Sequence, residues 1–232
     1  MNVPARKSPT VARAFSLIEL LVVVAIIALM LVMAAPTMSS AFKGSKLNQG
    51  AEATRNFLAA AHLTAIKNNL PVEVRFYEYD DPDTPETTKY VMAYQMYLVR
   101  LDARSTDLSK STPQYEKVDD LKHLPAGIVL STLSSPKSQS TLLDKTLVRT
   151  GKESIKGVDP EKQETEVDYY SFQFRPDGSM DLPSLKAGVR QKWFMTVLGR
   201  DEFVRGLEKT PSNYVCLNLN PANGDIRWLQ PN

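Results

Sequence analysis

Cysteine and histidine are scarce in this sequence of 232 residues, which contains one cysteine, Cys216, and two histidines, His62 and His123. A single cysteine excludes an intrachain disulfide and a metal site built from several thiolates. The two histidines stand far apart in the chain and form no ligand cluster, so we expect both to be surface or packing residues. We expect Cys216 to be a small buried residue of a strand over 214–219.

The sequence also lacks the motifs of catalysis. It contains no glycine-rich phosphate loop, no nucleophile elbow and no HExxH zinc motif. The acidic turn over 80–85 carries oxygen ligands that suit calcium, but it lacks the glycine and terminal glutamate spacing of an EF-hand. An enzyme held by an uncleaved anchor would need a cleft with titratable groups, for which the sequence offers no candidates. We therefore expect no cofactor and a structural rather than an enzymatic role.

A strong charge bias is missing too. The formal net charge is +2, and the first fourteen residues hold Arg6, Lys7 and Arg13 without any acid. Without them, the chain is close to neutral, whereas binding nucleic acid through its phosphates needs a clustered basic surplus. Binding of DNA stays open as an alternative if basic side chains gather on one face, for example Lys186, Arg190, Lys192, Arg200 and Arg205.

One long apolar segment is present, over residues 15–35, and its single charged residue is Glu19. As a helix it is long enough to cross about 30 Å of hydrocarbon. The basic residues before it predict a cytoplasmic N-terminus and a head outside the membrane. A secretory signal peptide would have a shorter apolar core and a cleavage site after it, near Ala35. A carboxylate in a membrane segment marks a function or a partner.

The sequence RAFSLIELL over residues 13–21 resembles the class III signal of type IV prepilins and pseudopilins. The resemblance implies cleavage between Ala14 and Phe15 and N-methylation of Phe15. It also implies that Glu19 pairs with the N-terminal amine of a neighbouring subunit in a filament, and that Pro36 bends the helix. Ala14 stands where most members of the family have glycine.

The same resemblance implies where the protein works and with what. The chain would start in the inner membrane as a single-pass protein, with its head in the periplasm, and then enter a pilus or pseudopilus. Its partners would be a prepilin peptidase, other pilin or pseudopilin subunits, the inner-membrane assembly platform and membrane lipid.

The rest of the chain predicts an α+β fold, in which a long N-terminal helix packs on a β-rich head. The family resemblance implies that this head is a small antiparallel β-sandwich. We divide the chain into a leader (1–14), a membrane or filament-core helix (15–38), its amphipathic continuation (39–70) and a β-rich head (71–232). The head contains a loop-rich insertion around 102–166.

Periodic patterns support this division. An apolar stripe at helical spacing predicts the packed face of residues 39–70: Leu47, Ala51, Thr54, Leu58, Ala61 and Ala65. Asn68 and Asn69 before Pro71 predict where the helix stops. Alternating or β-rich runs predict strands over 72–77, 90–101, 168–174, 193–198, 214–219 and 226–229. The aromatic residues Phe172, Phe174, Trp193 and Trp228 are expected in the core.

Three short motifs in the head extend the resemblance: LPAGI over 124–128, FRPDGS over 174–179 and NGDIR over 223–227. They resemble the head signature of H-type minor pseudopilins. Residues 54–79 further resemble the prepilin-like cassette protein D group of verrucomicrobial genomes. The resemblance implies a minor subunit of a type II secretion pseudopilus or a type IV pilus-like filament. The alternative is a minor pilin whose head binds DNA during uptake.

Overall fold

The structure, a computed structural model, describes residues 16–81, 88–101, 112–132, 140–158, 162–182, 192–206 and 209–230, with only the backbone of 31–41 and of 101. The predicted cleavage residues Ala14 and Phe15 lie outside the described residues, as do Lys186 and Arg190. The chain divides into two compact units, Met1–Phe42 and Lys43–Asn232. Helix α1 (Leu17–Asn68) begins in the first unit and ends in the second.

In the second unit, α1 presents one face to a large core. Every member of the predicted stripe is buried, and none of its side chains is more than 2% exposed. Phe57, which the stripe did not include, is buried as well and stacks against Tyr94 with ring centroids 4.3 Å apart. Burial of these side chains, rather than helix propensity, stabilises this part of α1.

The end of α1 follows from a left-handed residue. Asn69 has a φ of 52°, and the amides of Asn69 and Leu70 donate to the carbonyls of Ile66 and Ala65. This is the Schellman arrangement, which satisfies the last helical carbonyls. Pro71 then prevents further helix. The predicted stop is confirmed.

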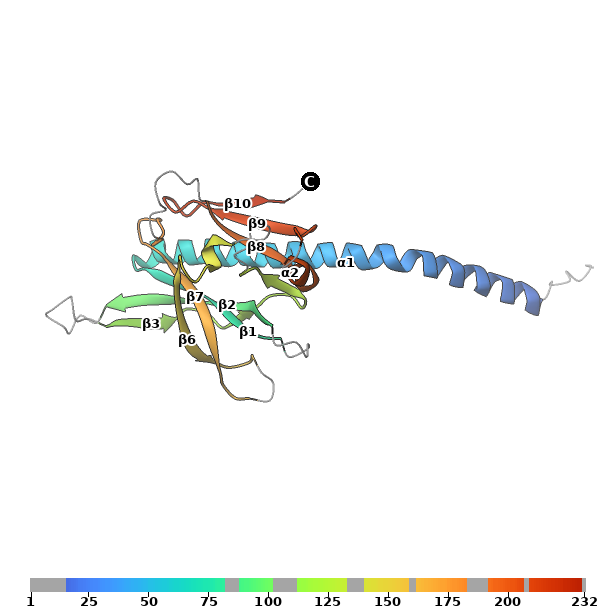
Figure 1. Ribbon diagram of the computed structural model, residues 1–232, viewed down its shortest axis with the longest axis horizontal. Coiled ribbons are helices and arrows are strands. Elements are labelled where there is room, and N and C mark those ends of the chain that lie inside the picture. The colour runs from blue at the N-terminus through green and yellow to red at the C-terminus, as the bar shows by residue number, and fades with distance from the viewer. Residues whose placement is uncertain are drawn as a thin grey trace, which may run out of the picture. The chain divides into compact units, whose positions relative to one another are not determined.

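In the described residues, ten strands form one antiparallel sheet with the order β10-β9-β8-β5-β2-β1-β7-β6, and β3 and β4 also pair with β2 (Figure 1). Their bounds are β1 (Val72–Asp80), β2 (Lys89–Leu101), β3 (Pro113–Lys117), β4 (Lys122–His123), β5 (Ile128–Leu130), β6 (Arg149–Ile155), β7 (Thr165–Phe174), β8 (Trp193–Gly199), β9 (Tyr214–Leu219) and β10 (Ile226–Leu229). A 3-10 turn, η2 (Thr141–Leu143), precedes β6, and a short helix, α2 (Arg200–Gly206), follows β8.

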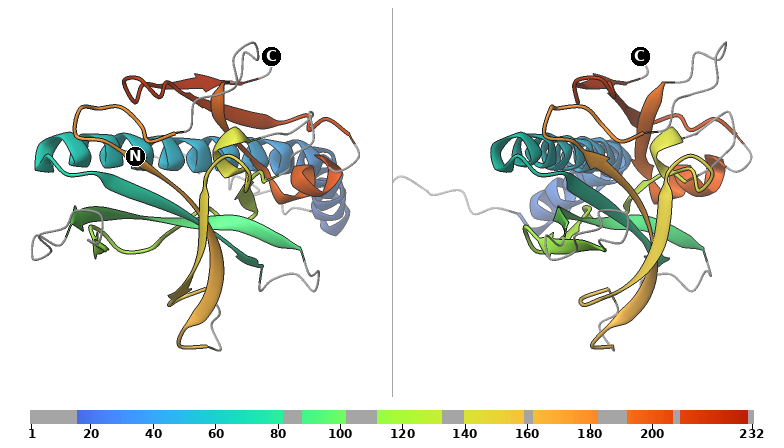
Figure 2. Two further views of the ribbon diagram at one scale, coloured as in Figure 1. Left: turned by 60° about the vertical axis from the view of Figure 1, so that its left-hand side comes forward. Right: turned by 90° about the vertical axis from the view of Figure 1, so that its left-hand side faces the viewer.

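The sheet curls around the second part of α1. Strands β8, β9 and β10 lie on one side of this part of the helix, and β1, β2, β7 and β6 lie on the other (Figures 1 and 2). The core between them includes Phe76 and Phe172 from one side and Met195 and Leu217 from the other. The predicted α+β class is confirmed, and the strands of the head join one continuous sheet that curls around the buried face of the helix. Phe172, Phe174 and Trp193 are buried, and Trp228 packs against the core while partly exposed.

The stretch 102–166, predicted to be rich in loops, contributes β3, β4, β5, η2 and β6 to the head. Strand β6 forms seven residue pairs with β7, from Arg149↔Ser171 to Ile155↔Thr165. Its sequence, RTGKESI, is polar because it is the last strand of the sheet and most of its side chains face solvent. Backbone pairing with β7, and not an apolar pattern, makes it a strand.

Candidate functional sites

The first turn of α1 holds Glu19 in a capping box. The backbone amide of Ser16 donates to Glu19 Oε2 at 2.9 Å, and the amide of Ile18 lies 3.3 Å from Ser16 Oγ. A serine with a glutamate three residues later satisfies free amides at a helix start reciprocally. The carboxylate of Glu19 therefore has a local function in the chain itself. Because Ser16 keeps its amide N–H after a cut between Ala14 and Phe15, this contact survives the predicted processing.

The helix that follows Glu19 exposes apolar side chains. Leu17, Ile18, Leu29 and Met30 are between 62% and 82% exposed. In the part of the chain that the structure describes, no helix is apolar over a length sufficient to cross a membrane. Pro36 lies within α1, and the bend expected there stays a prediction.

The LPAGI motif forms a turn against α1. The amide of Ile128 donates to the carbonyl of Pro125 at 3.0 Å, and Gly127 has a φ of 81°. A type II turn requires such a positive φ at its third residue, where glycine fits best. The turn lies directly on the helix at Gly50, since a Cβ on Gly50 would lie 2.7 Å from Ile128 Cγ2.

The other two head motifs meet at His62 of α1. Gly178 of FRPDGS and Gly224 of NGDIR both have positive φ, 84° and 68°. A Cβ on Gly224 would lie 2.7 Å from His62 Nε2, and a Cβ on Gly178 would lie 3.1 Å from it. The His62 ring also contacts Phe174, with ring centroids 5.6 Å apart. Two turns that are far apart in the sequence thus pack against the same residue of α1. His62 is a packing residue, as predicted.

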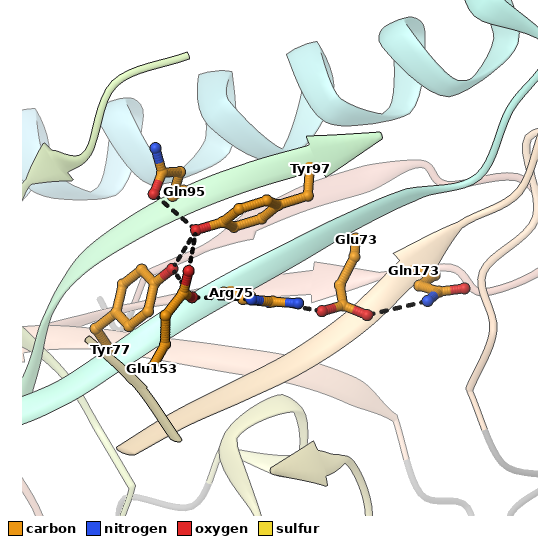
Figure 3. A network of polar contacts seen from close by, with 7 residues as sticks. All are labelled: Glu73, Arg75, Tyr77, Gln95, Tyr97, Glu153 and Gln173. Carbon is orange, nitrogen blue, oxygen red and sulfur yellow. Dashed lines mark hydrogen bonds and ion pairs between the residues drawn. The ribbon is translucent and has the colours of Figure 1, made fainter. Parts of the chain in front are cut away.

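A polar network fills the face of β1 that points away from α1 (Figure 3). Val74 and Phe76 belong to the core beside α1, so the alternation of a strand turns Glu73, Arg75 and Tyr77 to the other face. These three residues are at most 6% exposed. The sequence predicted a half-buried strand, but β1 is buried on both faces, because Tyr115 of β3 and Glu153 of β6 contact Arg75 on its far face.

Arg75 is the centre of this network. Its Nε donates to Glu73 Oε1 at 2.7 Å, and its Nη1 donates to Glu153 Oε2 at 2.8 Å. Its guanidinium also lies 4.3 to 4.7 Å from the ring centroids of three tyrosines, Tyr97, Tyr115 and Tyr169. Burial alone would lower the pKa of Arg75, but the two carboxylates outweigh this and raise it. The guanidinium therefore stays charged, paired and inaccessible to a ligand.

Glu153 completes the network from β6. Its Oε2 accepts from the Tyr77 hydroxyl at 2.8 Å, and its Oε1 lies 2.9 Å from the Tyr97 hydroxyl. Burial alone would raise the pKa of Glu153, but hydrogen bonds from Arg75, Tyr77 and Tyr97 lower it. The arrangement fixes β6 to β1 and β2, and it leaves no reactive group free. We assign it a structural role.

Of the cations considered for binding DNA, two are paired within the described residues, while Lys186 and Arg190 lie outside them. Arg200 pairs with Asp81, and Arg205 pairs with Glu202 at 3.4 Å. The same pairing occupies the Asp81 carboxylate of the acidic turn, while residues 82–87 lie outside the described residues. Cys216 is half-buried in β9, and burial raises the pKa of its thiol to about 11.

The His123 imidazole lies 3.1 Å from the Tyr79 hydroxyl, and burial lowers its pKa. In the described residues, no three side chains among His, Cys, Asp and Glu come together in a way that could hold a metal ion.

Comparison with known proteins adds one match. Residues 10–35 match the family described as the prokaryotic N-terminal methylation motif. No curated protein matches the chain, and no solved structure matches it. The matched segment contains Ala14, Phe15 and Glu19, the residues to which the sequence assigned processing and assembly. The motif indicates a type IV pilin-like or pseudopilin-like protein that is processed by a prepilin peptidase.

Proposed function

We propose that the protein is a structural subunit, and a minor one, of a type II secretion pseudopilus or a type IV pilus-like filament. A prepilin peptidase cuts between Ala14 and Phe15 and methylates Phe15. The apolar segment then holds the chain in the inner membrane, with the head in the periplasm, until the assembly platform adds it to a filament of related subunits. The observation that carries the proposal is the methylation motif. The later part of this motif lies in α1, where apolar side chains are exposed.

Glu19 is the residue to which the proposal assigns assembly. A carboxylate among apolar side chains is costly to bury unless it has a partner. Its hydrogen bond to Ser16 offsets part of that cost within one chain, and the N-terminal amine of a neighbouring subunit supplies the opposite charge in the filament. The charge would therefore favour assembly in register.

The assignment to a minor subunit rests on the head. The three motifs that resemble H-type minor pseudopilins are contact points on α1, at Gly50 and at His62. They support a head that is built around the helix in the way the resemblance implies. They assign no catalytic chemistry.

Processing is tested by mass spectrometry of the N-terminus after co-expression with a prepilin peptidase. The proposal expects a chain that begins with N-methylated Phe15. An intact Met1, or a cut near Ala35, would exclude the pseudopilin assignment. The variant Ala14→Gly is the matched control, and we expect it to be cut at the same bond at least as fast as the natural chain.

The role of Glu19 is tested with two variants that separate its charge from its capping function. Glu19→Gln removes the charge but keeps a side chain that can accept from the Ser16 amide, whereas Glu19→Ala removes both. We expect both variants to enter the membrane and both to be lost from sheared filaments. If Glu19→Gln assembled normally, the residue would act as a helix cap and the proposed ion pair would be wrong.

A further inference from the structure

A groove on the head connects the LPAGI turn, α1 and α2. Two adjacent hollows of about 280 and 550 Å³ share five lining residues: Lys46, Ala126, Gly127, Ile128 and Arg200. Together they form an open depression rather than a closed pocket. All of it lies within the unit Lys43–Asn232.

The base and rim of this groove are held in place. Leu47 and Ile128 are buried beneath it, at 2% and 4% exposure, and the positive φ of Gly127 fixes the turn. On the rim, Lys43 pairs with Asp201 at 2.9 Å and Arg200 pairs with Asp81. The groove is therefore formed before any partner arrives, which lowers the entropy cost of binding.

Among the residues that the structure describes, the rim carries one uncompensated positive charge. Four cations line the two hollows, Lys43, Lys46, Arg200 and Arg205, against three carboxylates, those of Asp81, Asp201 and Glu202. Each carboxylate is already paired with one of the cations other than Lys46. Lys46 is exposed and has no ion-pair partner among the described residues. It is free to meet a negative group from outside.

We infer that this groove is a docking site for an extended, acidic polypeptide segment of a second protein, with a carboxylate of that segment on Lys46. One surplus positive charge complements one carboxylate, and it is too little for the several phosphate contacts by which proteins hold nucleic acid. An extended chain suits two hollows that share the turn, because its backbone can run past the exposed turn residues Ala126 and Gly127 while its side chains enter both hollows. The inference concerns the head alone and is independent of the entry of the chain into a filament.

The test measures fluorescence anisotropy of a short labelled peptide in which glutamate and leucine alternate, titrated with the full-length protein in detergent micelles. We expect saturable binding that weakens with salt, and no comparable binding of the same peptide with glutamine in place of glutamate. Lys46→Glu should weaken binding by about tenfold, since it replaces an attraction with a repulsion. Ala126→Trp should abolish it by filling the groove without a change of charge.

Lys67→Glu is the matched control, because Lys67 is also an exposed lysine of α1 but does not line the groove. We expect it to bind like the natural protein. The inference is overturned if the glutamate and glutamine peptides bind equally, if Lys67→Glu weakens binding as much as Lys46→Glu does, or if no binding is found at the highest soluble peptide concentration. Tighter binding of a DNA oligonucleotide than of the acidic peptide would also overturn it.

Discussion

Replacement of Glu153 by glutamine tests whether the buried network holds β6 to the sheet. The two side chains have nearly the same shape, so the substitution removes the charge and one acceptor without creating a cavity. Arg75 can only donate, so it would lose its hydrogen bond to Oε2 or meet the amide NH₂ group as a second donor. The tyrosine hydroxyls can reorient, because a hydroxyl donates or accepts.

The size of the effect follows from the partners that remain. Loss of one member of a buried ion pair typically costs about 3–5 kcal/mol. Arg75 keeps Glu73 at 2.7 Å, and the Glu153 side chain is 19% exposed, so water screens part of the loss. We therefore expect Glu153→Gln to lower the free energy of unfolding by about 2–3 kcal/mol at neutral pH.

The effect should depend on pH with a definite sign. The pKa of Glu153 is lowered in the folded protein, so its contribution is fully present above the ordinary carboxyl pKa. It is lost as the pH falls through the lowered value, where the folded carboxylate takes up a proton. The difference between the natural chain and Glu153→Gln should thus be largest near neutral pH and shrink as the pH falls below the ordinary carboxyl pKa.

Urea unfolding followed by tryptophan fluorescence measures this difference, because Trp193 is buried in the core. Glu166→Gln is the matched control, since Glu166 pairs with Lys152 at 3.3 Å but is 64% exposed. We expect the control to change stability by less than about 0.5 kcal/mol. Equal stability of Glu153→Gln and the natural chain, or a difference that does not change with pH, would refute a stabilising role for the network.

Three further predictions concern single positions. Gly50→Ala should destabilise the head by about 1–2 kcal/mol, because its Cβ would lie 2.7 Å from Ile128 Cγ2. Gly44→Ala should stabilise α1, because a Cβ there would have nothing within 4 Å. Thermal unfolding of both variants checks that the two changes in stability have opposite signs. Asn69→Val should lower stability by about 1–2 kcal/mol, because a β-branched residue disfavours a φ of 52°, whereas Asn69→Gly should not lower it. Equal urea unfolding midpoints for the two variants would contradict this prediction. Cys216 should react slowly with a disulfide reagent near neutral pH and fast after unfolding, since burial raises its pKa to about 11; rapid reaction of the folded chain would contradict it.

The sequence predicted those elements whose cause is local. The stripe on α1 was recognisable because apolar residues recur at helical spacing, and the stop because Asn68 and Asn69 precede Pro71. The strand over 226–229 was predicted with its observed bounds. The polar strands β3, β4 and β6 were missed, because backbone pairing with a neighbour leaves no periodic signal in the sequence. The apolar strand β5 was missed as well, because its three residues are too few to show a period.

The candidate sites likewise divide into those formed by neighbouring residues of the chain and those formed by distant ones. Residues 13–21 carry their chemistry in a continuous motif, so the sequence alone determined the candidate cleavage bond and the isolated charge at Glu19. The capping contact between Ser16 and Glu19 also joins residues that are close in the chain. What only the tertiary structure decided is which distant residues meet: Arg75 with Glu153, both glycine turns with His62, and the LPAGI turn with Gly50. These contacts arise because the sheet curls around α1, and this curvature depends on the packing of all the strands at once.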